Sequence, residues 1–182
     1  AALGLGREEA TVIVYLAVAR ERGGDLEGAR ALHAQSLDRA RAAGDLRGMV
    51  NARINLGHIA QRRGDLGAAL EHGQASLRLA QRAGMRPAAL YARLNTASQL
   101  VRIGCLDRAR TELDAASRLA EETSAPDMAA AAALMRGVAR ARGGEVTEGL
   151  AEIEAAAQRF AALGQADDAA DARLDAAGGL LD

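Results

Sequence analysis

The sequence predicts an all-α solenoid built from antiparallel helix pairs, with about nine helices in 182 residues. The first observation behind this prediction is that glycines recur every 40 residues, at Gly24, Gly64, Gly104 and Gly144. The second is that apolar residues between these glycines follow the helical period, with two helices to each repeat. A fixed period of this size is typical of stacked helical units that cannot bury their apolar faces alone.

The glycine spacing also sets the repeat boundaries. Repeats are predicted over residues 5–44, 45–84, 85–124 and 125–164, with a half repeat over 165–182. We interpret residues 1–182 as a single solenoid and as a fragment of a longer protein. Residues 1–4 have the phase of residues 41–44 and 81–84, so we expect them to end a helix of a preceding repeat.

Each repeat is expected to contain a first and a second helix joined by a short turn. First helices are predicted over 7–22, 46–62, 86–102, 126–142 and 166–180, and second helices over 26–42, 66–82, 106–122 and 146–162. Short connections force neighbouring helices to be antiparallel. Asp25, Asp65 and Glu145 are expected to cap the second helices. Cys105 has the same phase, and we interpret it as a lost cap.

Small residues share one phase in the middle of the first helices, at Ala17, Gly57, Ala97, Gly137 and Ala177. A glycine inside a helix costs about 1 kcal/mol relative to alanine, so a packing reason is expected. We predict that the second helix approaches closely here, through Ala29, Ala69 and Ala109.

Composition and motifs exclude several function classes. The net charge of -1 and the aromatic content of 2% disfavour nucleic-acid binding. A membrane span and a signal peptide are not visible, which favours the cytoplasm. The sequence has no nucleophile motif and no phosphate-binding glycine motif, and His33 and His72 do not have ligand spacing with His58. We therefore predict no enzyme activity, no metal and no cofactor.

The repeat resembles the tetratricopeptide repeat family at Asn55-Leu56-Gly57, Gly64-Asp65-Leu66, Ala69 and Ser76-Leu77. It departs from that family in its period, which is 40 rather than about 34 residues, and in lacking large aromatic residues at Arg53, Ala60 and Gly73. The longer helices resemble the long-repeat subgroup, which includes kinesin light chains and the sensor arrays of large bacterial regulators.

This resemblance implies that the first helices line a concave groove. Groove residues then recur at spacings of 4, 3 and 4, which place them on one helix face. The resulting partner-binding candidates are Asn51, Asn55, His58, Arg62, Tyr91, Asn95, Ser98, Arg102, Arg22 and Arg142. The stripe continues less markedly through Thr11, Tyr15 and Val18, through Ala131, Met135 and Val138, and through Asp171, Asp175, Gly178 and Asp182.

These candidates predict a protein-interaction module that binds a peptide or partner segment in the groove. By resemblance, Asn55 and Asn95 pair with a peptide backbone, because an amide both donates and accepts hydrogen bonds. Arg22, Arg62, Arg102 and Arg142 either read acidic groups of the partner or stabilise helix ends. The module is expected to belong to a larger bacterial signalling or transcriptional regulator. The alternatives are sensing of a small-molecule effector and self-assembly through exposed solenoid ends.

Overall fold

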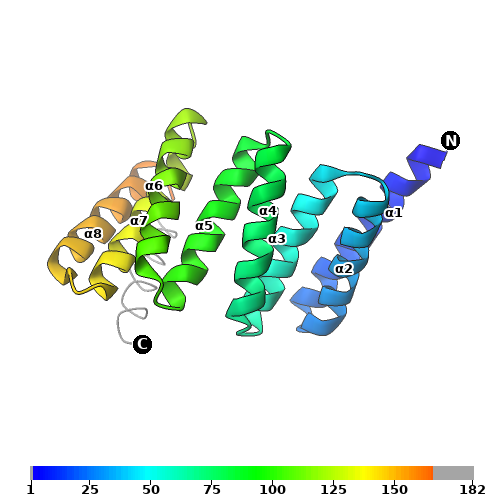
Figure 1. Cartoon of the computed structure of the whole chain (residues 1–182), viewed down its shortest axis with the longest axis horizontal. Helices are drawn as coiled ribbons and strands as arrows, with labels where there is room; N and C mark the ends of the chain where they lie inside the picture. The colour runs from blue at the N-terminus through cyan, green and yellow to red at the C-terminus, as the bar shows by residue number, and fades with distance from the viewer. Residues whose placement is uncertain (1, 166–182) are drawn as a thin grey trace. The chain divides into compact units, whose positions relative to one another are not determined.

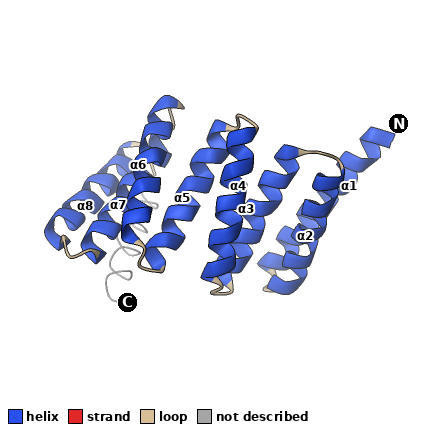
Figure 2. Ribbon diagram, viewed as in Figure 1, coloured by secondary structure: helices blue, strands red, loops and turns tan. Residues whose placement is uncertain are grey.

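The computed structural model describes residues 2–165, with side chains described from Val12 onward. These residues form eight α-helices and no strand (Figure 2). The helices are α1 (Ala2–Arg22), α2 (Leu26–Ala42), α3 (Leu46–Arg62), α4 (Leu66–Arg82), α5 (Arg86–Arg102), α6 (Leu106–Glu122), α7 (Pro126–Arg142) and α8 (Val146–Ala162). None of them is long and apolar enough to cross a membrane. The predicted ninth helix and the acidic residues Asp171, Asp175 and Asp182 lie outside the described residues.

The chain divides into two compact units, Ala1–Ala92 and Arg93–Asp182. In the first unit α2 packs against α1 and α3, and α3 packs against α4. Figure 1 shows that α2 and α4, the second helices of two successive repeats, lie on the same side of this unit. In the second unit α7 packs against α6 and α8. The all-α fold of antiparallel helix pairs is confirmed.

The prediction for the start of the chain was wrong. Residues 2–4 do not end a separate helix, because α1 runs without a break from Ala2 to Arg22. The later repeats break at this phase through a glycine with positive φ, as at Gly44 and Gly84, whereas residue 4 keeps helical backbone inside α1.

The acidic caps were predicted correctly at two of three positions. Asp25 accepts a hydrogen bond from the Gly28 N–H at 2.8 Å, and Asp65 accepts one from the Ala68 N–H at 2.9 Å. Cys105 makes no side-chain cap bond, as expected. Glu145 also makes none, so its assignment as a cap was wrong. Its carboxylate instead forms an ion pair with Arg110, which lowers the pKa of Glu145.

The turns between helices depend on left-handed backbone at intervals of 20 residues. Glycine occupies this conformation at seven turns: Gly24, Gly44, Gly64, Gly84, Gly104, Gly144 and Gly164. The turn between α6 and α7 has Ser124 there instead, at φ 51°. A side chain with a Cβ is strained in this region, so Ser124 is a local source of instability.

Replacing Ser124 with glycine is expected to raise the free energy of unfolding by about 0.5 to 1 kcal/mol. Removing the Cβ relieves the backbone strain, and the remaining cost is the greater freedom of glycine in the unfolded chain. Chemical denaturation of wild type and Ser124→Gly measures the difference. As a control, Ser117→Gly inside α6 should destabilise, because its backbone is helical. Equal destabilisation by both changes would contradict the prediction.

Close approach of the helices at the small-residue phase was predicted correctly for Gly137 but not for Gly57. A Cβ added at Gly137 would lie 2.8 Å from the Gly149 carbonyl oxygen and 2.8 Å from the Ile153 side chain. A Cβ added at Gly57 would lie 3.5 Å from the His72 Cβ, which is an ordinary contact. Of these two glycines, only the one at the contact between α7 and α8 is therefore required by packing.

Candidate functional site

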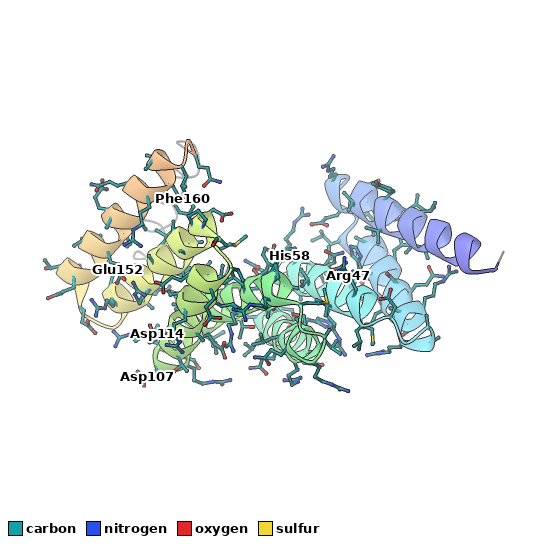
Figure 3. All side chains as sticks on the ribbon, turned by 90° about the horizontal axis from the view of Figure 1, so that it is seen from above. Arg47, His58, Asp107, Asp114, Glu152 and Phe160 are labelled. Atoms are coloured by element: carbon teal, nitrogen blue, oxygen red, sulfur yellow. The ribbon has the colours of Figure 1, made fainter. Side chains whose placement is uncertain are left out.

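The predicted groove stripe of the first unit is centred on α3. Asn51 and Arg62 are exposed on this helix, and Asn55 and His58 are half-buried. Figure 3 labels His58 among the side chains of this unit. At about 100° of rotation per residue, these four positions share one face of α3. The structure therefore presents hydrogen-bonding groups along about three turns of one helix.

Tyr91 from the start of α5 joins this face through His58. The Tyr91 hydroxyl lies 3.0 Å from His58 Nε2, and the two rings meet edge to face with centroids 5.8 Å apart. Burial lowers the pKa of His58, while the nearby Glu21 carboxylate acts in the opposite direction. The imidazole is thus neutral at pH 7, so Nε2 is able to accept from or donate to the hydroxyl, depending on its tautomer.

Asn55 is oriented by a histidine that the sequence analysis did not place at the stripe. Its side-chain nitrogen lies 3.5 Å from Nδ1 of His33, which belongs to α2 and is only 1% exposed. Burial lowers the pKa of His33, and the neighbouring His58 lowers it further. No group of three or more metal-ligating side chains occurs among the described residues.

Arg62 and Arg142 make equivalent contacts in different repeats. Arg62 donates from Nη1 to the Glu21 carboxylate at 2.9 Å and lies 3.4 Å from the Glu21 carbonyl oxygen. Arg142 donates to the carbonyl oxygen of Val101 at 3.1 Å. Each partner lies 41 positions earlier, in the last turn of the preceding first helix. A cation is favourable there because it balances the helix dipole and satisfies terminal carbonyl groups.

The remaining predicted residues are distributed over both units. Arg22 is exposed at the end of α1, and Tyr15 is 72% exposed on the same helix. Asn95, Ser98, Arg102 and Arg142 lie in the second unit. Asn95 and Ser98 are half-buried, and Arg102 is exposed. The side chain of Thr11 is outside the described set.

A second candidate site, which the sequence analysis missed, is a pocket of 650 Å³ between α2, α3 and α4. Its apolar part is formed by Ala34, Leu37, Leu56 and Ala60, and its charged part includes Arg30, Arg41, Arg53 and Arg63. On α3, Arg53, Leu56 and Ala60 lie about 160° around the helix axis from the groove stripe. The pocket and the stripe therefore occupy opposite faces of α3.

Arg53 is the most enclosed cation of this pocket, with 17% of its side chain exposed. Its Nη1 lies 3.1 Å from Nδ1 of His72 and 3.9 Å from the Glu71 carboxylate. Burial lowers the pKa of Arg53, and the positive charge of Arg41 lowers it further. The pKa of His72 is also lowered, first by burial and then by Arg53. Neutral His72 accepts the hydrogen bond from Arg53, which remains charged.

Sequence reasoning missed this pocket because it treated only the first helices as binding surface. One signal was present in the sequence. Arg53 stands where the tetratricopeptide pattern has a large aromatic residue, and in the structure its guanidinium contacts His72 of α4. A charged residue at an expected core position predicts either a buried partner or a polar cavity.

Comparison with known proteins agrees with this architecture. Residues 8–82 match the family model described as Tetratricopeptide repeat. A comparison with curated protein sequences finds no match to this chain. BtubC (BKLC) from P. vanneervenii is similar in structure, with a TM-score of 0.71 and 18% identity over 92% of this chain and 78% of that chain.

Two Rap proteins are also similar in structure. A Rap protein complexed with Competence and Sporulation Factor gives a TM-score of 0.72 and 13% identity, and the apo form of RapI gives 0.73 and 10%. The matches cover 96% and 97% of this chain but only 55% and 52% of the Rap chains.

A thermophilic TPR protein in Thermus thermophilus gives a TM-score of 0.53 and 20% identity, covering 94% of this chain and 99% of that chain. At these identities the structural matches establish the fold, and the family model supplies the sequence evidence over residues 8–82. Residues 8–82 therefore match the tetratricopeptide repeat family, and the described chain as a whole has the fold of tetratricopeptide repeat solenoids.

Proposed function

We propose that this chain binds an extended segment of a partner protein along the groove stripe of its first unit. The observation that carries the proposal is that two first helices, α3 and α5, combine hydrogen-bonding side chains on one face. Asn51 is exposed, Asn55 and His58 are half-buried, and Tyr91 meets His58 from the neighbouring helix. Amide side chains both donate and accept, which matches the alternating groups of an extended backbone.

The similar Rap protein supports this proposal, since it has been solved in complex with Competence and Sporulation Factor. The chain spans about half of each Rap chain. We propose that it serves as the binding part of a larger cytoplasmic regulator in a bacterium. Arg62 is held by Glu21, so a partner carboxylate has to compete with that ion pair. The asparagines are therefore expected to dominate recognition, with acidic partner groups contributing less.

Selection from a random peptide display library tests the proposal, followed by affinity measurement on the selected peptides. The variant Asn51→Ala/Asn55→Ala removes two amides from the stripe. The matched control Gln35→Ala/Gln81→Ala removes two exposed amides from α2 and α4. Since each hydrogen bond contributes about 1 kcal/mol, we expect the stripe variant to bind about tenfold or more weakly.

The control variant should bind the selected peptides as wild type does. Thermal unfolding of all three proteins establishes that the stripe variant is folded, because Asn55 also contacts His33. Equal affinity of both variants would show that the stripe is not the peptide site.

A further inference from the structure

One pair of positions in the repeat carries different residues in the two units. Arg93 of α5 forms an ion pair with Glu112 of α6, and the two side chains are 20% and 25% exposed. Arg53 lies 40 positions before Arg93, and His72 lies 40 positions before Glu112. The same geometry brings Arg53 and His72 to 3.1 Å. In the first unit a neutral imidazole therefore occupies the place of the carboxylate.

This substitution leaves Arg53 with weak charge compensation. Its ion-pair partner among the described residues is Glu71, at 3.9 Å, and that carboxylate is 75% exposed. A guanidinium with 17% of its side chain exposed is expected to have a carboxylate at hydrogen-bonding distance. The position taken by Glu112 in the second unit shows how such a carboxylate is accommodated by this repeat.

The carboxylates that line the pocket are already engaged. Glu27 pairs with Arg30 at 3.0 Å and with Arg63 at 2.7 Å. Asp38 pairs with Arg41 at 3.0 Å. The third carboxylate, at position 65, accepts the capping hydrogen bond of α4. Arg53 is thus the cation of the pocket that has no close carboxylate within the described residues.

We propose that the pocket between α2, α3 and α4 binds a small organic acid, whose carboxylate lies beside Arg53 as Glu112 lies beside Arg93. The hydrocarbon body of the ligand packs on Leu37 and Leu56, each 5% exposed, and on Ala60, which is 7% exposed. The volume of 650 Å³ is within the usual range of small-molecule sites, about 300 to 1,000 Å³. This site lies on the opposite face of α3 from the groove stripe and is independent of the proposed peptide binding.

The test is a titration of the full chain with 4-methylpentanoate, monitored through the side-chain N–H signals of its arginines by NMR. The neutral amide 4-methylpentanamide has nearly the same shape and serves as the ligand control. We expect saturable shifts of the Arg53 signal with the acid and none with the amide. The variant His72→Glu supplies the carboxylate internally, so it should weaken acid binding about tenfold or more.

The matched control is Gln81→Glu, which adds the same charge to an exposed position of α4 outside the pocket. It should bind the acid as wild type does. If His72→Glu does not fold, Arg53→Gln replaces it as the loss-of-binding variant. Equal binding by wild type and the loss-of-binding variant would overturn the proposal, as would equal binding of acid and amide.

A third ligand identifies the source of the carboxylate. An acetylated, amidated pentapeptide with a central glutamate presents the same group on a peptide backbone. Binding of this peptide without binding of the free acid would overturn the assignment to a small organic acid. The stripe variant Asn51→Ala/Asn55→Ala leaves the pocket intact, so it should bind 4-methylpentanoate as wild type does. Peptide binding by the stripe and acid binding by the pocket are therefore tested independently of each other.

Discussion

Gly137→Ala is expected to lower the free energy of unfolding by about 2 kcal/mol, whereas Gly57→Ala, two repeats earlier, is expected to raise it by up to about 1 kcal/mol. At Gly137 the new Cβ would lie 2.8 Å from a backbone carbonyl of α8, which cannot move without shifting the helix. At Gly57 the nearest atom is 3.5 Å away, so the gain in helix propensity is not opposed.

Chemical denaturation of the two single variants measures both effects against wild type. Each variant is the control for the other, because the substitution and the repeat phase are the same and only the helix contact differs. Amide hydrogen exchange should place the loss from Gly137→Ala in α7 and α8. A stabilised Gly137→Ala variant would contradict the backbone contact between these helices.

The helix boundaries were predictable because their signals are local. A glycine follows every described helix except α6, and an aspartate precedes α2, α3 and α4; these residues are adjacent in sequence and act on the same turn. The seven helices from α2 to α8 therefore begin and end where the repeat predicts. Glu145 failed as a cap because the competing group, Arg110, lies 35 positions away in another helix.

The candidate sites depended more on distant contacts and were only partly predictable. Helical spacing correctly placed Asn51, Asn55, His58 and Arg62 on one face of α3. It did not show that Arg62 reaches Glu21, or that His33 of α2 meets Asn55, because these contacts depend on how neighbouring helices pack. The pocket around Arg53 needed the same information, since three helices form it.

The three histidines suggest how the first unit responds to acid. His33, His58 and His72 are the only histidines of the sequence, and all lie in this unit. Each has its pKa lowered, and burial is the largest cause in every case. The unfolded chain, with histidine pKa values of about 6.5, therefore binds protons more readily than the folded unit does.

Stability from this source is fully present above pH of about 6.5 and is lost as the pH falls toward the folded pKa values. The free energy of unfolding then falls by at most about 1.4 kcal/mol per pH unit for each histidine. Protonation would also break the hydrogen bond from Arg53 to His72 and place two cations together. We therefore expect acidification from a pH of about 7.5 to about 5.5, which spans the ordinary histidine pKa, to destabilise the first unit more than the second.

Hydrogen exchange at the two pH values, corrected for intrinsic rates, measures this difference unit by unit. Protection in α2, α3 and α4 should fall, while protection in α6, α7 and α8 should change little. The variant His33→Gln/His58→Gln/His72→Gln keeps polar side chains but cannot titrate in this range, so it should lose the extra acid sensitivity of the first unit. An equal loss of protection at the lower pH in that variant would assign the effect to carboxylates instead, because only histidine titration has been removed.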